Sequence, residues 1–347
     1  MRDILHRTLI VRFSSIGDIL LSTPLVRLLR RRFPESEIDY AVKEEYAELL
    51  RGNPHLSRLI VLPRNAPFAA LRSMRREVRG RGYDRIIDIH DSLRSRYLSA
   101  NAGPVVRVNK RKLARLLLVK TKLNVYGRLG GAPGVAERYL ETVEDLDIRD
   151  DGKGLEVFPG PDHAERAAAA LAGVSGAVIA LAPGARHWNK MWPQERFVEA
   201  SVQLVRRLRA SVLLFGSAAD LERSGWIEQR IRAAAAGAVV VNLSGRLSLL
   251  ETAAAMDRAS VVVTNDSGLM HLAAARKRPV VALFGPTVRE LGFFPVGTRA
   301  EVLEVEDLRC RPCTHIGLSF CPKDHFRCML DIPASRVVES ATRLCAE

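Results

Sequence analysis

The sequence has no hydrophobic run that could cross a membrane as a helix. Its 347 residues contain no stretch that approaches the ~20 apolar residues such a helix needs. The first residues, MRDILHRTLIVRF, lack a signal-peptide pattern and run directly into an expected strand. We therefore expect cytoplasmic residence, either free or at the inner face of a membrane.

Two common nucleotide-binding signatures are also absent. The loop after the first expected strand, RFSSIGD at residues 12–18, lacks the spacing of the dinucleotide fingerprint G-x-G-x-x-G and has no Walker lysine. A dehydrogenase or an NTPase is therefore disfavoured.

Acidic residues are scarce relative to basic ones. The chain has 39 Asp and Glu against 53 Lys and Arg, a formal net charge of +14. This excess favours an anionic partner, such as nucleic acid, an anionic membrane surface or a phosphorylated substrate, with plain solubility as the alternative. A nucleic-acid-binding protein is the least favoured of these, since the sequence shows neither aromatic platforms nor a recognisable binding module.

Cysteines are few, and four of the five lie in one short segment, at Cys310, Cys313, Cys321 and Cys328. The C-x-x-C pair followed by two more cysteines is compatible with structural zinc, although the second half is looser than a paired zinc knuckle. Disulfides are disfavoured in a cytoplasmic chain, so reduced, partly buried thiols are the favoured interpretation and zinc the alternative. The segment has no helical period and predicts a loop-rich appendage.

Short apolar runs alternate with helical patterns along the chain. We expect strands at residues 8–13, 38–42, 59–62, 85–89 and 105–108, and again at 177–182, 211–215, 239–242, 260–264 and 279–284. This alternation predicts an α/β fold with doubly wound sheets, and the length favours two domains. The Gly-, Pro- and acid-rich stretch at 150–161 is the best linker. We expect domains at 1–155 and 156–347, with a final helix that crosses back onto the first half.

The stretch around which the chain is organised is ASVVVTNDSGLMHLAAARKRPVVALFGPT, residues 259–287. It predicts a βαβ unit with parallel, buried strands and a ligand loop at the carboxyl end of the first. Ser267 and Gly268 place backbone N–H groups at a helix start, where an anion is favoured. Asp266 suits sugar or ribose hydroxyls, and His271 points back toward the same loop. The alternative is that Asp266 or Ser267 only caps the helix and His271 packs on its flank.

Two further loops carry candidate chemistry. In RFSSIGD, the helix dipole would keep Asp18 ionised as a modest base that is always available, and a helix-capping role fits equally well. In PGARHWNKMWPQERF, residues 183–197, Gly184 follows a strand end and Lys190 is placed to neutralise a diphosphate.

A basic stretch at residues 107–128 is interleaved with leucines. It suits a membrane surface or a phosphorylated lipid, and the alternative is a solvated helix face.

Four stretches in combination resemble glycosyltransferase family 9, the lipopolysaccharide heptosyltransferases: VRFSSIGDILLSTPLVRLLRRRFP, YDRIIDIHDSLRS, PGARHWNKMWPQERF and TNDSGLMHLAAARKRPVVALFGPT. The resemblance implies a GT-B architecture, two Rossmann-like domains facing a cleft, with the acceptor half first and the nucleotide-sugar half second. It also implies metal-independent, inverting transfer of heptose from ADP-heptose to the inner core of lipid A-linked lipopolysaccharide. The enzyme would be peripheral at the inner face of the inner membrane and need no cofactor. Another nucleotide sugar or acceptor on this scaffold is the runner-up, and a nonenzymatic lipid A-binding scaffold is a third possibility.

The resemblance also implies roles for individual residues. Asp18 would be the general base. The donor would be bound by Gly184, Lys190, Asp266, Ser267, Gly268, His271 and Thr287. From the loops at the strand ends and from the basic stretch, we expect the phosphorylated acceptor to be bound by Ser14, Ser15, Arg94, Lys110, Arg111 and Arg115. His90 and Asp91 stand where the family usually has a Gln-Gly pair, which leaves the acceptor open.

Overall fold

The computed structural model describes residues 5–346, which divide into two compact units. The first unit comprises the described residues up to Lys110 together with Val135–Phe158, and the second comprises Arg111–Gly134 together with the described residues from Pro159 onward. The last boundary falls within the expected linker. The segment Arg111–Gly134 differs from the expected division, because its buried Ala114, Leu118 and Tyr126 form a small apolar cluster with Val288 of the second unit.

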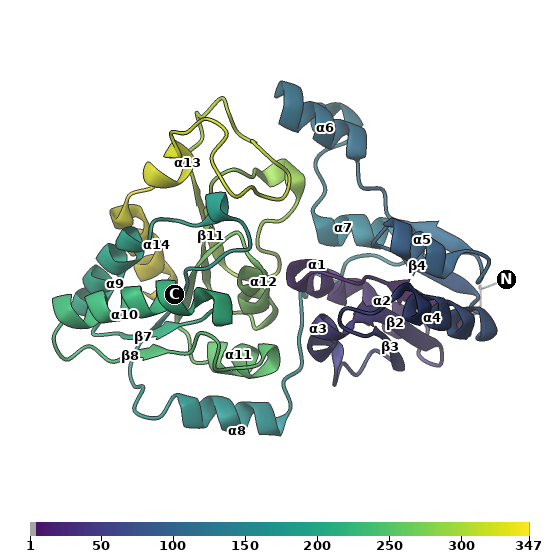
Figure 1. Cartoon of the computed structure of the whole chain (residues 1–347), viewed down its shortest axis with the longest axis horizontal. Coiled ribbons are helices and arrows are strands. Elements are labelled where there is room, and N and C mark those ends of the chain that lie inside the picture. The colour runs from purple at the N-terminus through teal and green to yellow at the C-terminus, as the bar shows by residue number, and fades with distance from the viewer. Residues whose placement is uncertain (1–4, 347) are drawn as a thin grey trace. The chain divides into compact units, whose positions relative to one another are not determined.

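The first unit is built on a five-stranded sheet of order β3-β2-β1-β4-β5, in which every pair of neighbours is parallel (Figure 1). The apolar, β-branched runs of the sequence form the strands, and side chains from both faces are buried. The strands are β1 (Arg7–Val11), β2 (Glu37–Lys43), β3 (Arg58–Leu62), β4 (Arg85–Asp88) and β5 (Val105–Arg107).

In the first unit, the first helical pattern of the sequence is divided into two helices, and Pro24 lies where the second begins. The pattern at residues 18–32 predicts one helix with a kink or a short first segment, and the structure has a short α1 followed by α2, with Pro24 in the first turn of α2. Proline has no N–H to donate, so it is tolerated where a helix begins. The helical elements are α1 (Ile16–Leu20), α2 (Thr23–Arg32), α3 (Glu44–Ala47), η1 (Glu48–Leu50), α4 (Phe68–Gly80), α5 (Leu93–Ser99), α7 (Val135–Leu140) and η3 (Glu141–Leu146).

The second unit is built on a six-stranded parallel sheet of order β11-β10-β9-β6-β7-β8. The expected βαβ unit is confirmed as β9, α12 and β10. The sheet has one strand more than expected, β11, whose mostly half-exposed side chains lack an apolar run. The strands are β6 (Val178–Ala182), β7 (Ser211–Leu214), β8 (Val240–Asn242), β9 (Val261–Asn265), β10 (Val280–Phe284) and β11 (Ala300–Glu304).

Helices flank this second sheet, and α14 is part of its core. We expected this last helix to cross back to the first half. Instead Val337, Ala341 and Leu344 are buried in the second unit's own apolar cluster. The helical elements are α6 (Lys112–Thr121), η2 (Tyr126–Leu129), α8 (Pro161–Ala170), η4 (Trp188–Lys190), α9 (Gln194–Leu208), η5 (Ala218–Asp220), α10 (Leu221–Ala234), α11 (Leu249–Met256), α12 (Gly268–Ala275), η6 (Arg289–Leu291), α13 (Arg327–Leu330) and α14 (Ala334–Ala346). Over residues 5–346, no helix has the length and apolar character that a membrane span requires.

Each sheet has the strand order of a Rossmann-like fold and therefore a topological switch point. The order reverses between β1 and β4 in the first unit and between β6 and β9 in the second. Ligands of open α/β sheets bind outside the carboxyl ends of the strands at this point. The predicted α/β class with two doubly wound sheets is confirmed, and the loops after these four strands are where a site is expected.

Candidate active site

Asp18 lies at the switch point of the first sheet, in the first turn of α1 directly after β1. One carboxylate oxygen, Oδ1, is 2.7 Å from the Arg12 guanidinium and accepts a hydrogen bond from the Tyr139 hydroxyl at 3.3 Å. The other, Oδ2, accepts bonds from the hydroxyl and the backbone N–H of Ser15, at 3.0 and 3.3 Å. Asp18 therefore forms a capping box with Ser15, which is one of the two roles that the sequence allowed, and it also carries an ion pair with Arg12.

The environment of Asp18 keeps it ionised. Burial alone would raise the pKa of this carboxyl, but the charge of Arg12 and the hydrogen bonds from Ser15 outweigh burial, so the pKa lies below its ordinary value. Arg12 is itself fixed, because its Nε donates to Ser14 O at 2.6 Å and its Nη1 to Ile89 O at 2.8 Å. Sequence reasoning missed Arg12 as the partner of Asp18, since an arginine at a strand end carries no distinctive signal.

His90 follows β4 and faces the same edge of the sheet. Its Nδ1 accepts a hydrogen bond from the backbone N–H of Phe13 at 3.0 Å. Burial and the positive charges of Arg12 and Lys110 lower the pKa of His90 to about 3, so the imidazole is neutral at physiological pH. A neutral ring with Nδ1 as acceptor carries its proton on Nε2, where it can donate to a ligand hydroxyl or carboxylate.

The residues predicted to bind the acceptor are divided between the two units. Ser14, Ser15, Arg94 and Lys110 belong to the first unit, while Arg111 and Arg115 belong to the second. Lys110 is close to the Asp18 site, since its Nζ donates to the backbone carbonyls of His90 and Asp91.

In the second unit, three predicted donor residues meet at the carboxyl ends of β6, β9 and β10. The Nζ atom of Lys190 is 2.6 Å from Oδ2 of Asp266, and the Thr287 hydroxyl donates to the same oxygen at 2.7 Å. The side chains of Lys190 and Asp266 are only 11% and 6% exposed. Asp266 is thus not a cap of α12, and the two residues predicted for diphosphate and sugar form one buried ion pair.

Backbone geometry around this pair is set by two neighbouring residues. Asn265 binds both loops, because its Oδ1 accepts from Trp192 N at 3.0 Å and its Nδ2 donates to Pro183 O at 2.9 Å. At Gly184 a Cβ atom would lie 2.1 Å from Oδ1 of Asp220, so a larger residue would require the Asp220 carboxylate to move. The predicted contact of Gly184 with the donor stays a prediction.

The predicted helix start is also present. Ser267 is the N-cap of α12 in extended backbone, and Gly268 is its first residue, with no side chain capping the helix. His271 is buried one turn further along. The N–H groups of the first turn are therefore at the same strand ends as Lys190, which favours an anion at this point.

The model of the family described as glycosyltransferase family 9 (heptosyltransferase) matches residues 71–323. The chain belongs to this family. It is 27% identical over 340 residues to lipopolysaccharide heptosyltransferase 1 of Pseudomonas aeruginosa, covering 94% of this chain and 91% of that protein. It is 26% identical over 361 residues to lipopolysaccharide heptosyltransferase 2 of Salmonella typhimurium, covering 98% and 99%.

Solved structures of this glycosyltransferase family share the fold over the whole chain. The structure of ADP-heptose lps heptosyltransferase II from E. coli superposes with a TM-score of 0.73, at 25% identity and with 98% of both chains covered. A glycosyltransferase of family 9 from Veillonella parvula gives a TM-score of 0.83 at 23% identity, covering 98% of this chain and 97% of that one. The predicted resemblance is confirmed.

Arg311 supports the predicted donor residues and was missed from the sequence. Its side chain is 4% exposed and donates to the carbonyls of Gly285 at 2.5 Å and Thr287 at 2.9 Å, with an ion pair to Glu304 at 2.5 Å. It therefore ties together the ends of β10 and β11 and fixes the residue whose hydroxyl holds Asp266. In the sequence Arg311 lies between two cysteines, so this segment was interpreted in terms of metal binding and not of support for the β10 loop.

The four clustered cysteines are free, and among the described residues no three His, Cys, Asp or Glu side chains are arranged to hold a metal ion. The arrangement therefore does not support the zinc that we considered at Cys310, Cys313, Cys321 and Cys328. Burial, with smaller contributions from neighbouring sulfurs, raises the pKa of Cys313 to about 11 and that of Cys328 to about 12, so both are protonated thiols. The segment is also less of an appendage than expected, since Cys328 is buried in the core of the second unit.

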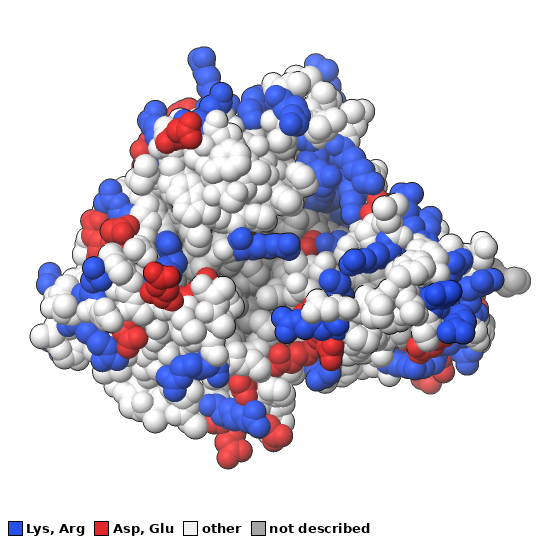
Figure 2. Space-filling model, in the orientation of Figure 1, with Lys and Arg blue, Asp and Glu red and all other residues white. Residues whose placement is uncertain are grey.

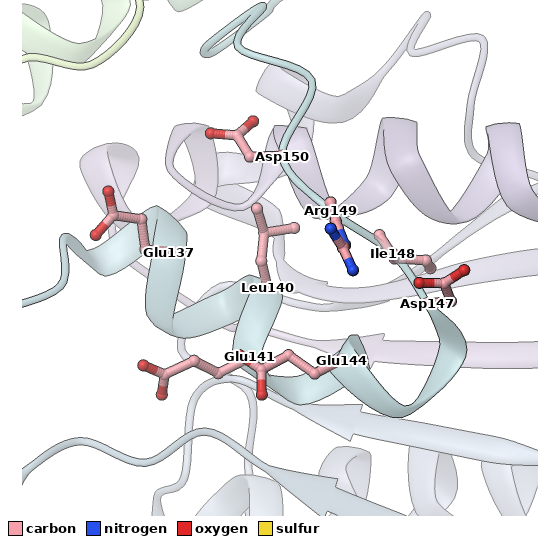
Figure 3. A pocket seen from close by; sticks show the side chains of 8 residues that line it. All are labelled: Glu137, Leu140, Glu141, Glu144, Asp147, Ile148, Arg149 and Asp150. Carbon is pink, nitrogen blue, oxygen red and sulfur yellow. The ribbon is translucent and has the colours of Figure 1, made fainter. Parts of the chain in front are cut away.

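A pocket of about 460 Å³ in the first unit contains none of the predicted site residues (Figure 3). Its carboxylates come from α7, η3 and the loop that follows: Glu137, Glu141, Glu144, Asp147 and Asp150. Arg149 is the one cation among the lining residues, so the five carboxylates leave the pocket negative overall, which disfavours a diphosphate or a phosphorylated acceptor. The strand ends, and not this pocket, therefore stay the candidate site.

Proposed function

We propose that this family 9 glycosyltransferase moves a heptose from ADP-heptose to the inner core of lipid A-linked lipopolysaccharide, by a single inverting displacement that does not depend on a metal. The observation that carries the proposal is the buried constellation of Lys190, Asp266 and Thr287 at the switch point of the second sheet. Relatives named as lipopolysaccharide heptosyltransferases match this chain over nearly its whole length.

The first unit supplies the base of the proposed displacement. Asp18 takes the proton of the acceptor hydroxyl as that oxygen bonds to the anomeric carbon of the heptose. Because its pKa is lowered, Asp18 is ionised when the acceptor binds. A carboxylate of low pKa is a weak base, so it accepts the hydroxyl proton in the same step in which the new C–O bond forms. Arg12 and Tyr139 hold one carboxylate oxygen and Ser15 the other, so the carboxylate is already oriented before the acceptor binds.

The second unit supplies charge for the departing group. The bond from the anomeric carbon to the diphosphate breaks, and ADP leaves from the opposite face of the sugar with the electron pair. Lys190 and the N–H groups at the start of α12 stabilise this charge from preorganised positions. Asp266 orients Lys190 and accepts from sugar hydroxyls.

The test is transfer from radiolabelled ADP-heptose to a panel of truncated lipopolysaccharide acceptors. We expect label on a single acceptor and stabilisation of the protein by ADP-heptose in thermal unfolding. If no acceptor is labelled and ADP-heptose gives no stabilisation, the donor is a different nucleotide sugar.

We also propose that the enzyme is peripheral at the inner face of the inner membrane and binds it through α6 and the residues after it. Four leucines of this segment are exposed: Leu113 at 70%, Leu116 at 54%, Leu123 at 51% and Leu129 at 49%. The opposite side of α6 is fixed by buried Ala114 and Leu118, so the exposed leucines cannot turn inward.

Basic side chains surround these leucines. Lys112, Arg115, Lys120, Lys122 and Arg128 lie in the same segment, and Figure 2 shows Lys and Arg gathered where Figure 1 places α6. The segment is anchored to its own unit, because Lys122 Nζ donates to Pro312 O at 2.6 Å and Asn124 donates to Glu290 at 2.8 Å. Apolar side chains with surrounding cations fit an anionic lipid surface.

Replacing Leu113 and Leu116 with serine is expected to weaken binding to vesicles that contain an anionic phosphatidylglycerol by roughly tenfold, because less apolar surface enters the lipid. Vesicle sedimentation measures this. The matched control replaces Leu221 and Val239, which are 50% and 40% exposed elsewhere in the second unit. Equal vesicle binding by wild type and the α6 variant would show that this segment does not bind the membrane.

A further inference from the structure

Two half-buried thiols flank Arg311, the residue that supports the predicted donor residues. Cys310 and Cys313 are free, and they are more exposed than Cys321 and Cys328, whose side chains are buried. Cys-x-x-Cys is the spacing found in thiol–disulfide oxidoreductases, where the two sulfurs form a disulfide reversibly. A bond between these two thiols would enclose the backbone of Arg311 in a small ring.

The surroundings of Cys310 suit a thiol that attacks an oxidant. Its Sγ lies 3.7 Å from Nε2 of His325, and Nδ1 of the same ring accepts from the backbone N–H of Arg327 at 3.0 Å. In the neutral ring the proton is then on Nε2, so His325 presents an N–H to the Cys310 sulfur. A thiolate accepts such a hydrogen bond better than a thiol does, and the thiolate is the nucleophile.

Cys313 is suited to the second step of a disulfide exchange. Its thiol donates to the backbone carbonyl of Cys310 at 3.2 Å, so it lies beside the first thiol. Burial, with a smaller contribution from Cys310, raises the pKa of Cys313 to about 11, so this thiol stays protonated and does not compete for the oxidant. Once Cys310 carries a mixed disulfide, Cys313 is the neighbouring thiol that can displace the attached group.

The cysteine segment, residues 310–328, is tied to one of the two predicted donor loops. Arg311 donates to the carbonyls of Gly285 at 2.5 Å and Thr287 at 2.9 Å. The hydroxyl of Thr287 in turn donates to Asp266 at 2.7 Å. A chain of hydrogen bonds therefore leads from the residue between the two thiols to the carboxylate of the buried ion pair.

The same segment also supports the loop that carries Lys190. The backbone N–H of Asn189 donates to Leu318 O at 3.2 Å, and Oδ1 of Asn189 accepts from Leu318 N at 2.8 Å. Gly317 has a φ of +121°, which favours glycine, and a Cβ atom there would lie 2.5 Å from Cβ of His187. The cysteine segment therefore contacts both loops of the predicted donor site.

Formation of a disulfide requires both sulfurs to leave their present partners. The sulfurs must approach to about 2 Å, whereas one now lies against His325 and the other against a backbone carbonyl. The two residues between them are held from outside the ring, Arg311 by the loop after β10 and Pro312 by Lys122. Closing the ring therefore acts on the backbone that positions Arg311.

We propose that Cys310 and Cys313 are a site of reversible oxidation that controls the donor loops. The oxidant is a disulfide of low molecular weight, RSSR, which is reduced to two RSH as the two thiols form one disulfide. Oxidation withdraws Arg311 from the carbonyl of Thr287 and weakens donor binding, and reduction restores both. The inference rests on the proposed function only for the identity of the donor.

The exchange takes two balanced steps. The Cys310 thiolate attacks one sulfur of RSSR, the S–S bond of the oxidant breaks, and the released thiolate takes up a proton to become the first RSH. The Cys313 sulfur then attacks Sγ of Cys310, and the bond of Cys310 to the attached group breaks. That group leaves as a thiolate and takes up the Cys313 proton, which gives the second RSH.

Peptide mapping by mass spectrometry tests the oxidation site. In the full-length protein treated with oxidised glutathione, we expect a Cys310–Cys313 disulfide that dithiothreitol removes. Cys313→Ser should stop at a mixed disulfide on Cys310, whereas Cys310→Ser should leave Cys313 as a thiol. Cys345→Ser is the matched control, because Cys345 is a half-buried thiol of α14, and the disulfide should form in it as in wild type. Thiols that persist at both positions in the wild type overturn the inference.

Hydrogen exchange tests the coupling without any donor. In the oxidised wild type, peptides that contain Gly285 and Thr287 are expected to exchange roughly tenfold faster than in the reduced protein, because their carbonyls lose a charged hydrogen-bond donor. The variant Cys310→Ser with Cys313→Ser keeps Arg311 and should exchange like the reduced wild type before and after the oxidant. Equal exchange in oxidised and reduced wild type contradicts the coupling.

Donor affinity gives the functional readout. By isothermal titration calorimetry, ADP-heptose is expected to bind the oxidised wild type roughly tenfold more weakly than the reduced protein, while the double variant binds it equally in both conditions. Equal affinity of both wild-type states for ADP-heptose overturns the control of donor binding. If the reduced protein does not bind ADP-heptose while the disulfide and the exchange difference are present, the proposed function fails and the oxidation site stands.

Discussion

Asp18→Asn is expected to reduce the rate of heptosyl transfer by roughly 10²- to 10⁴-fold, which is the usual contribution of a positioned general base. Asparagine has the shape of aspartate and can still accept from Ser15, but Arg12 loses the charge of its ion-pair partner, so we expect the variant to fold with reduced stability. ADP-heptose should stabilise the variant in thermal unfolding as much as wild type, since Asp18 belongs to the first unit and the donor residues to the second.

The pH profile of the wild type gives an independent check on Asp18. Because its pKa lies below the ordinary value, the carboxylate is fully ionised at and above pH 5. His90, with a pKa of about 3, is neutral over the same range. Transfer rates should therefore show no acid limb from either group between pH 5.5 and 8.

Asp84→Asn is the matched control for Asp18. Asp84 lies at the opposite end of the same strands, where its carboxylate accepts from the backbone N–H groups of His6 and Arg7 at 2.8 Å. This variant should transfer heptose at the wild-type rate. A rate for Asp18→Asn within a few fold of wild type would show that another group takes the proton.

Lys190→Met should cost both stability and transfer. Removing one partner of a buried ion pair leaves the other charge uncompensated, so the free energy of unfolding should fall by about 3–5 kcal/mol. The rate should fall by roughly 10²- to 10³-fold because the departing diphosphate loses a preorganised cation. Chemical denaturation and single-turnover transfer measure the two effects.

The double variant Lys190→Met with Asp266→Asn separates these effects. It no longer buries an unpaired charge, so much of the stability should return. Transfer should stay low, because the cation for the diphosphate is still missing. Recovery of transfer along with stability would mean that the ion pair is structural only.

The βαβ unit at residues 259–287 could be predicted because continuous apolar, β-branched runs at both ends leave little choice but buried parallel strands. β11 could not be predicted, because its sequence AEVLE has no apolar run and is equally compatible with a loop. In the structure most of its side chains are half-exposed at the sheet edge. The split of the first helical pattern into α1 and α2 was only partly predictable. Pro24 marked the position, but tertiary packing decides whether a helix bends or restarts.

For the site, residue types at strand ends were predictable and their partners were not. Asp18, Lys190 and Asp266 each follow an expected strand, which is where ligands of open α/β sheets bind. Arg12 and Arg311 stand among many arginines, and only the fold shows that one pairs with Asp18 and the other with the carbonyl of Thr287.

The division of the chain into units has a consequence for synthesis on the ribosome. The backbone passes between the units three times, after Lys110, Gly134 and Phe158. Residues 111–134 are therefore translated before any of residues 159–346, on which Ala114 and Leu118 pack. Until Val288 and Pro312 emerge, this leucine-rich, basic segment has no core to join and is open to chaperones and to lipid. A nascent chain stalled before residue 288 should be the form most prone to aggregate.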